Sequence, residues 1–337
     1  MTADLPGVGG GVRACPEDFE VEEIPAYLPC GKGEHLFLWI EKRGVSAEQL
    51  LDHLADTLGV ARDEIGCAGL KDRHAVSRQF VSVPRVAEIQ LSEVDTADIR
   101  VLDAQPHTNK LRTGQLRGNR FRIVVRKAAA DALERARAIV ARLERDGLPN
   151  YFGPQRFGRD GSTAQIGRQL LLGEIDRPPG PPGRQRFLRK LVLSAAQALL
   201  FNRYLGRRLT DGLLRTVLDG DVMLKQTGGI FYVSDVAAEQ ARFDGRETVH
   251  AGPIFGKKMF AARGEALRRE EAIVDEAGIG RERFGAFGKL LAGTRRANLV
   301  YVDDLDLESV DDGLELRFSL PAGSYATVLL GELMKSE

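Results

Sequence analysis

The chain has 337 residues, 43% of them hydrophobic and 28% charged, and its formal net charge at pH 7 is zero. This length exceeds the usual size of one hydrophobic core, so we expect two domains. No apolar run approaches the roughly 18 residues of a membrane span, and the N-terminus lacks the basic-then-apolar order of a signal peptide. We therefore expect a cytoplasmic protein with no membrane partner. Three widely spaced cysteines, Cys15, Cys30 and Cys67, indicate neither a disulfide framework nor a zinc site.

The first 149 residues predict mainly strands, with two helices. Alternating apolar and polar residues predict strands at Asp18–Glu23, His35–Ile40, Ala75–Val83, Ile99–Leu102 and Asn119–Val125. A turn is expected at Lys42–Gly44, and Ser46 is placed to cap a helix that runs to Leu58. A second amphipathic helix is expected at Asp131–Asp146, because a glycine and a proline follow it.

A compositional break follows that second helix. The segments Pro149–Gly161 and Arg177–Arg186 are too rich in proline and glycine to continue an element, so we place a domain boundary near Pro149. The elements expected beyond it are helices at Leu188–Leu209, Ala261–Gly278 and Ala286–Leu291, strands at Ala297–Val302 and Leu314–Leu320, and a terminal helix. A helical middle between two strand-rich ends indicates an inserted domain, with the first and last parts of the chain closing one sheet.

Charge is unevenly distributed along the chain, although it sums to zero. Gln105–Lys127 carries seven basic residues and no acid, whereas Asp303–Glu315 carries seven acidic residues and no base. Such segregation predicts one basic face able to follow a phosphate backbone, with the acidic run lying away from that backbone. The alternative is that both runs are solvated faces of ordinary elements.

The stretch Cys67–Val83 contains the first candidate for chemistry. Asp72 lies between Lys71 and Arg73, just before a predicted strand. Opposite charges nearby favour the ionised carboxylate, which is the form that a nucleophile requires. The alternative is that Asp72 caps a turn or pairs with a neighbouring cation.

Templates for other common active sites do not fit the chain. Neither Gly252–Lys257 nor Gly285–Lys289 has the spacing of a phosphate-binding loop, and the early glycines do not follow a strand as a dinucleotide site requires. The five histidines show no metal-ligand spacing and no GxSxG motif is present, so we expect no metal site. Asp72 remains, together with aromatic and basic residues of the kind that stack on bases and hold phosphates. These residues are Phe121, Tyr151, Phe152, Arg156 and Phe157.

Four stretches resemble the signature blocks of the tRNA pseudouridine synthase D family. They are AGLKDRHAVSRQ (Ala68–Gln79), GNRF (Gly118–Phe121), PNYFGPQRFG (Pro149–Gly158) and RFSLPAGSYAT (Arg317–Thr327). The segments PEDFEVEEI (Pro16–Ile24) and GEHLFLWIEKRG (Gly33–Gly44) are similar to the opening of the same family. The resemblance runs in the expected order over nearly the whole chain.

This resemblance implies an isomerase that converts uridine to pseudouridine at position 13 of tRNA, without cofactor or metal. Its partner would be tRNA, and no protein partner is implied. The implied fold is α+β: a pseudouridine-synthase-like catalytic domain with a mixed, mainly antiparallel sheet flanked by helices, plus an inserted α/β domain specific to the family. The catalytic domain would comprise residues 1–149 and 295–337, and the inserted domain residues 150–294.

The resemblance also implies which residues form the site. Asp72 matches the catalytic aspartate of the family's GxKD block, and Asn119 and Phe121 match the active-site residues of its GN-x-F block. Lys71 and Arg13, the basic residue before the PEDF block, are the two candidates that would keep Asp72 charged. The remaining substrate-binding candidates are Arg117, Arg156 and Phe318.

Two other classes of function stay open from the residues alone. The same basic face would serve a catalytically silent RNA-binding protein or RNA chaperone, although an intact Asp72 and Asn119 favour an enzyme. A hydrolase or phosphatase with a carboxylate nucleophile would need a second acid and metal ligands nearby, whereas the neighbours of Asp72 are basic.

Overall fold

The computed structural model describes residues 1–335, apart from the side chain of residue 159. These residues form two compact units. The first, called here the sheet unit, comprises Thr2–Arg145, Val302–Ala326 and the described residues after 329. The second, called the middle unit, comprises Met1, Asp146–Tyr301 and Thr327–Leu329.

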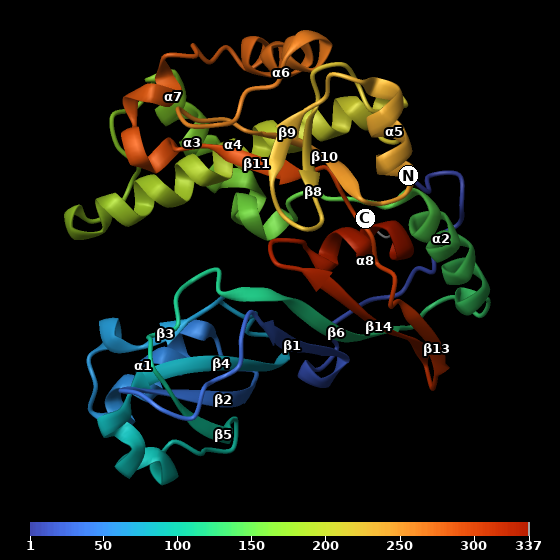
Figure 1. Ribbon diagram of the computed structural model, residues 1–337. Helices are drawn as coiled ribbons and strands as arrows, with labels where there is room; N and C mark the ends of the chain where they lie inside the picture. The colour runs from blue at the N-terminus through green and yellow to red at the C-terminus, as the bar shows by residue number, and fades with distance from the viewer. Residues whose placement is uncertain (336–337) are drawn as a thin grey trace. The chain divides into compact units, whose positions relative to one another are not determined.

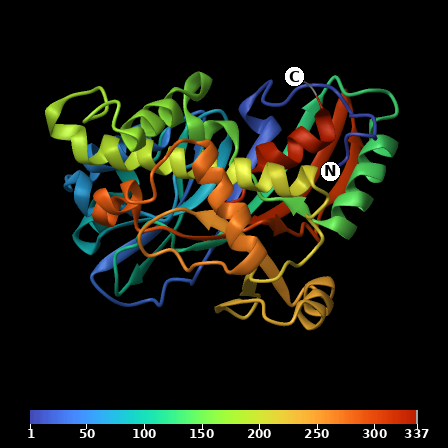
Figure 2. The same cartoon turned by 90° about the horizontal axis from the view of Figure 1, so that it is seen from above.

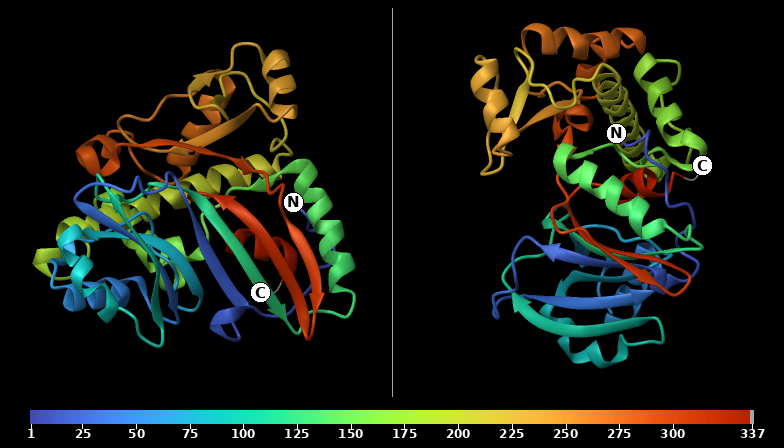
Figure 3. Two further views of the ribbon diagram at one scale, coloured as in Figure 1. Left: turned by 60° about the horizontal axis from the view of Figure 1, so that its bottom comes forward. Right: turned by 90° about the vertical axis from the view of Figure 1, so that its right-hand side faces the viewer.

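An eight-stranded sheet forms the frame of the sheet unit, in the order β13-β14-β6-β1-β4-β2-β5, with β3 paired to β4 (Figure 1). Its strands are β1 (Phe19–Pro25), β2 (His35–Arg43), β3 (Gly66–Cys67), β4 (Val76–Pro84), β5 (Ile99–His107), β6 (Leu116–Arg126), β13 (Asp306–Val310) and β14 (Gly313–Pro321). Only β1 and β4 run parallel; the other pairs are antiparallel. The expected mixed, mainly antiparallel sheet is confirmed, and Figure 3 shows β14 and β13 from the end of the chain beside β6 and β1.

Helix α1 (Ala47–Leu58) begins where the sequence predicted, because Ser46 forms a capping box. Its Oγ accepts from the Gln49 backbone N–H at 3.1 Å, and its own N–H donates to Gln49 Oε1 at 3.0 Å. Gly59 ends the helix in the left-handed conformation, with φ 62°. The helix buries a leucine stripe against strands β2 and β4. The other elements around the sheet are α2 (Ala132–Asp146), α8 (Ala326–Met334) and the 3-10 turns η1 (Pro16–Asp18), η2 (Arg62–Glu64) and η3 (Arg85–Glu93).

The turn expected at Lys42–Gly44 is wrong in its position. Strand β2 continues to Arg43, so Lys42 lies inside the sheet and is fully buried. Strand β5 is likewise longer than expected and reaches His107. Pairing with β4 and β5 on either side supports β2 to its end, which a local sequence pattern does not reveal.

The middle unit combines helices with a four-stranded antiparallel sheet in the order β11-β10-β8-β9. Its elements are β7 (Leu148–Pro149), η4 (Pro154–Phe157), η5 (Arg159–Gly161), α3 (Ser162–Leu172), η6 (Pro182–Arg184), α4 (Gln185–Thr210), β8 (Val222–Lys225), β9 (Ile230–Tyr232), α5 (Val236–Asp244), β10 (Thr248–Ile254), α6 (Gly264–Glu276), α7 (Arg283–Ala286), η7 (Gly288–Leu291), β11 (Thr294–Ala297) and β12 (Leu299–Val300). Helices α3 and α6 pack against the long α4 (Figure 2).

Two expectations for this region are corrected. The helix expected at Ala286–Leu291 is a short α7 followed by the 3-10 turn η7. The single strand expected at Ala297–Val302 is split into β11 and β12, which pair with β10 and β7 respectively. In addition, the sequence did not predict α3, α5 or strands β8 to β10.

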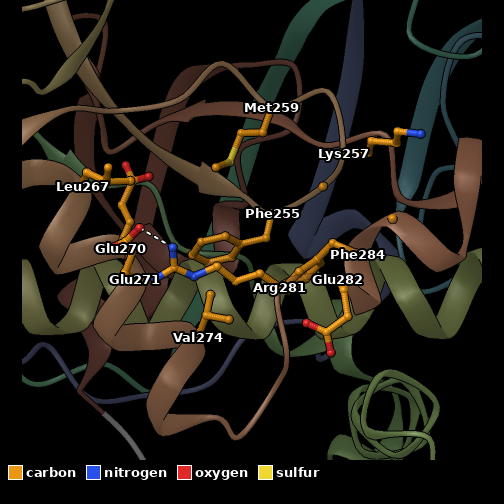
Figure 4. A pocket seen from close by; sticks show the side chains of 12 residues that line it. Phe255, Lys257, Met259, Leu267, Glu270, Glu271, Val274, Arg281, Glu282 and Phe284 are labelled. Carbon is orange, nitrogen blue, oxygen red and sulfur yellow. Dashed lines mark hydrogen bonds and ion pairs between the residues drawn. The ribbon is translucent and has the colours of Figure 1, made fainter.

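A cavity of about 340 Å³ lies in the middle unit beside α6 and α7 (Figure 4). Its wall is apolar, formed by Phe255, Met259, Leu267, Val274 and Phe284. Charged side chains surround it, and Arg281 there pairs with Glu271 at 2.5 Å. Within residues 1–335, no helix has both the length and the apolar character needed to cross a membrane.

Candidate active site

Asp72 lies in the loop between β3 and β4, where its carboxylate pairs with Arg13. Arg13 Nη2 donates to Asp72 Oδ2 at 2.7 Å, and the side chains are 28% and 44% exposed. The Arg13 guanidinium also lies 4.3 Å from the centre of the Phe19 ring. Of the two cations expected to keep Asp72 charged, the structure thus places Arg13 on its carboxylate. The anion is balanced by a fixed cation and stays accessible to a substrate.

Lys71 points to a different set of partners. Its Nζ lies 3.4 Å from Glu23 Oε2 and also donates to Asn119 Oδ1. The Lys71 and Glu23 side chains are only 5% and 1% exposed. Burial lowers the pKa of Lys71 and raises the pKa of Glu23, and their mutual attraction opposes both shifts. The residue before Asp72 therefore belongs to a buried ion pair, and its ammonium group also holds the Asn119 amide.

Lys42 holds the backbone of the Asp72 loop in place. Its Nζ donates to the carbonyl oxygens of Val45 and Asp72, each at 2.7 Å. Burial lowers the pKa of Lys42 to about 8, although the charge of Asp72 acts in the opposite direction. Sequence reasoning assigned Lys42 to a turn and so missed these two hydrogen bonds.

Asn119, Phe121 and Phe318 occupy one face of neighbouring strands. Phe121 lies opposite Phe318 in the pairing of β6 with β14, and their ring centres are 5.1 Å apart in a stacked arrangement. Both residues are buried, at 7% and 1% exposure. Gly118 permits this close pairing, because a Cβ there would clash with the Leu320 carbonyl oxygen. The expected stacking of a base on Phe121 stays a prediction.

The single basic face expected from Gln105–Lys127 is wrong for the part that forms β6. Three arginines of this strand are paired with acids: Arg120 with Glu22 at 2.9 Å, Arg122 with Glu20 at 2.7 Å and Glu315 at 2.6 Å, and Arg126 with Asp18 at 2.7 Å. One residue of the acidic run, Glu315, lies beside this strand, because β14 pairs directly with β6. Neighbouring strands thus neutralise charges that are separated in the sequence.

Four cations of the run are not neutralised in this way: Lys110, Arg112 and Arg117 lie before and at the start of β6, and Lys127 follows its end. Arg112 and Arg117 form no ion pair with any described residue, and Arg117 belongs to β6, which begins before the strand start expected at Asn119. Lys110 donates to the Asp63 carbonyl oxygen. Before and at the start of β6, these three residues remain available to phosphates.

A cavity of about 570 Å³ lies at this loop in the sheet unit. The residues around it are Tyr27, Leu28, His107, Thr108, Asn109, Lys110, Arg112 and Gln115. The Tyr27 hydroxyl donates to Gln115 Oε1 at 3.0 Å, and the Tyr27 ring stacks on His107 with centres 5.1 Å apart. The Gly114 N–H donates to the Ala68 carbonyl at 2.8 Å, which joins this loop to the segment leading to Asp72.

Comparison with known proteins identifies the family of the chain. The family model described as tRNA pseudouridine synthase D (TruD) matches residues 1–177 and 185–333. The chain belongs to the tRNA pseudouridine synthase D family. A relative of that name from Anaeromyxobacter sp. (strain Fw109-5) is 47% identical over 337 residues, covering 100% of this chain and 95% of its own length. Another, from Thermus thermophilus, is 45% identical over 339 residues, covering 100% and 92%.

A crystal structure from Methanosarcina mazei, of a protein assigned to tRNA pseudouridine synthase D, has the same fold. It matches with a TM-score of 0.76 and 23% identity, covering 100% of this chain and 96% of that one. The pseudouridine-synthase-like α+β fold expected from the resemblance is thereby confirmed. The division into a catalytic domain and a family-specific inserted domain stays a prediction.

Arg156, a further residue from a family block, lies in the middle unit. It is part of η4, and its guanidinium lies 5.6 Å from the centre of the Phe152 ring. Its role in binding RNA stays a prediction. Among the described residues of this family member, no three His, Cys, Asp or Glu side chains are grouped as metal ligands would be.

Glu23 and Lys42 are the site residues that sequence reasoning did not select. A signal for Glu23 was present, because Phe19, Val21 and Glu23 alternate along the strand and the first two are apolar. Burying a carboxylate on the same face costs free energy unless a cation pairs with it. Glu23 was therefore a candidate site residue that the sequence pattern could have indicated.

Proposed function

We propose that the protein isomerises uridine to pseudouridine in tRNA, at position 13, with Asp72 as the nucleophile. The observation that carries this proposal is the exposed Asp72 carboxylate, paired with Arg13 at 2.7 Å beside Lys71 and Asn119. The relatives at 45% to 47% identity carry the name of this activity. A carboxylate paired with a cation acts as a nucleophile without needing a general base.

The reaction explains the residue types at the site. The bond from uracil N1 to the ribose C1′ breaks, the base turns, and C5 bonds to C1′; the C5 hydrogen leaves as a proton and N1 gains one. Asp72 attacks either the base or the sugar and leaves again when the new bond has formed. Asn119 is a candidate to hydrogen-bond the uracil while it turns.

The uridine must first leave the tRNA stack, at a cost of a few kcal/mol. Phosphate contacts from Arg112 and Arg117 would position the strand but not select the base. The cavity at Tyr27 and Gln115 adds aromatic and amide groups beside these cations, which suits an RNA strand. These features support RNA as the ligand of the sheet unit.

The alternative is a catalytically silent RNA-binding protein or RNA chaperone. Incubation of the protein with tRNA lacking modifications, followed by mapping of pseudouridine, distinguishes the two. We expect one new pseudouridine at position 13 in tRNAs with uridine there. A pseudouridine at another position would overturn the assignment of position 13, and tRNA binding without any pseudouridine would favour the silent binder.

Arg112→Ala and Arg117→Ala should each flatten the salt dependence of tRNA binding. Removing one phosphate contact should reduce the slope of log affinity against log salt by about 0.7 to 0.9. The measurement is tRNA affinity over a series of salt concentrations. Arg100→Ala is the matched control. Arg100 is exposed and lies on β5 roughly 20 Å along the strand from His107, which lines the same cavity as Arg112. An unchanged slope in both test variants would mean that the RNA follows another path.

A further inference from the structure

Glu23 is a buried acid beside the proposed nucleophile that no step described above uses. Its side chain is 1% exposed, and its ion-pair partner is Lys71 at 3.4 Å. Neither of its carboxylate oxygens has a hydrogen-bond partner of normal geometry among the described residues. An ion pair that is buried but incompletely hydrogen-bonded stabilises a fold poorly, so this arrangement points to a role at the site.

The sheet fixes the position of Glu23 relative to Asn119. The two residues lie directly opposite each other in the antiparallel pairing of β1 with β6. Directly opposite side chains point to the same face and have Cβ atoms about 5 Å apart. Lys71 reaches both of them from the Asp72 loop, so one cation joins three segments of the chain.

The chemistry of Lys71 determines how the Asn119 amide is oriented. A lysine ammonium has only donors, so the atom of Asn119 that contacts it must be the carbonyl oxygen Oδ1. The amide Nδ2, with two donors, is then directed away from Lys71. A donor in that position is suited to a carbonyl oxygen of uracil or to the Asp72 carboxylate.

We propose that Glu23 is a positioning residue, which pairs with Lys71 so that Lys71 fixes the Asn119 amide with its donors available to the substrate. This inference rests on the proposed function. Glu23 itself touches no reacting atom, and its effect passes through Lys71 and Asn119.

Charged groups from several elements surround Lys71, and Glu23 is the one that favours its protonation most. The groups facing it are Glu23 from β1, Cys67 from β3 and Lys42 from β2. Burial lowers the pKa of Lys71, and Glu23 opposes that shift. Burial likewise raises the pKa of the Cys67 thiol, so Cys67 is neutral near pH 7 and does not replace Glu23 as an anion. Without the Glu23 charge, the pKa of Lys71 should fall further.

Glu23→Gln should lower kcat for pseudouridine formation by about 100-fold and leave KM for tRNA within about threefold, because the amide is misplaced but the RNA contacts are intact. In the Glu23→Gln variant, activity should decline at a lower alkaline pH than in the wild type, because Lys71 then loses its proton at a lower pH. Glu23→Asp should restore part of kcat. Glu22→Gln is the matched control, because Glu22 is the preceding residue of β1 but is 36% exposed and paired with Arg120. This variant should keep both the kcat and the pH profile of the wild type.

A double-variant comparison separates positioning from general stabilisation. In an Asn119→Ala background, Glu23→Gln should cause little further loss of kcat, because both changes remove the same amide donor. Equal losses in the two backgrounds, or an unchanged pH profile, would overturn the proposal. If Glu23→Gln does not fold, Glu23→Gln with Lys71→Met removes both buried charges; a wild-type kcat in that protein would also overturn it. Inactivity of both the wild type and Glu22→Gln would instead contradict the proposed function.

Discussion

Asp72→Asn should fold like the wild type and form no measurable pseudouridine. The amide keeps the shape of the side chain but cannot attack carbon, so we expect a loss of at least about 10³-fold in turnover. Asp72 is 44% exposed and its ion pair with Arg13 lies near the surface, so the free energy of unfolding should change by less than about 1 kcal/mol. The measurement is single-turnover pseudouridine formation on a tRNA with uridine at position 13, beside a urea unfolding curve.

Asp52→Asn provides the control for that experiment. Asp52 is also a surface aspartate of the sheet unit that pairs with an arginine, Arg62, at 2.5 Å. It lies on α1, outside the proposed site, so its variant should keep wild-type turnover. Activity of Asp72→Asn within tenfold of the wild type would show that Asp72 is not the nucleophile.

Arg208→Met should destabilise the middle unit by about 3 to 5 kcal/mol. Arg208 and Asp221 form a doubly hydrogen-bonded ion pair, at 2.8 and 2.6 Å, with side chains only 1% and 3% exposed. Arg208 also donates to the Tyr204 hydroxyl and to the carbonyls of Leu213 and Thr216. Removing the arginine leaves the buried Asp221 carboxylate without its cation and takes one donor from each of the two carbonyls, and the methionine has no donor to replace it.

The adjacent Arg207 offers a matched control for Arg208. Its pair with Glu276 is at a similar distance, 2.6 Å, but the side chains are 38% and 57% exposed. Arg207→Met should therefore change the free energy of unfolding by at most about 1 kcal/mol. Urea unfolding followed by circular dichroism reports the helices, whereas fluorescence of Trp39, the single tryptophan of the chain, reports the sheet unit. Equal destabilisation by the two changes would contradict the burial argument.

The contribution of the Arg208–Asp221 pair to the free energy of unfolding should depend on pH, and urea unfolding at a series of pH values measures it. Burial raises the pKa of Asp221, but the charge and hydrogen bonds of Arg208 outweigh this, so the pKa lies below its ordinary value. A carboxyl whose pKa is lower in the folded state stabilises the fold above its unfolded pKa of about 4. That contribution is lost as the pH falls through the folded value.

Local patterns in the sequence were sufficient where a residue's environment is set by its neighbours along the chain. Ser46 caps α1 because the cap needs only Gln49, three residues away. Lys42 was misplaced because its burial depends on β4 and β5, which flank β2 in the sheet. For the same reason, the charges of β6 looked like a free basic surface until their acidic partners on β1 and β14 were placed.

The residues of the candidate site also differ in whether the sequence alone could identify them. Asp72 was selected from its flanking cations, whereas Asn119 and Arg13 were found through their resemblance to family blocks. The structure shows the pairing of Asp72 with Arg13. Glu23 and Lys42 were missed because their importance comes from what they contact across strands and loops. Sequence alternation can place a residue on a buried face, but it cannot name the cation that faces it.

The position of β14 in the sheet has a consequence for how the protein is made. Strand β6, which carries Asn119, ends at residue 126, but its neighbour β14 begins only at residue 313. At about 5 to 20 residues per second, synthesis of the intervening chain takes roughly 10 to 40 seconds. Throughout that interval β6 is an open edge, able to pair with other chains. The ion-pairing arginines on this strand then act as a safeguard, because charged side chains discourage edge-to-edge association until the last strand arrives.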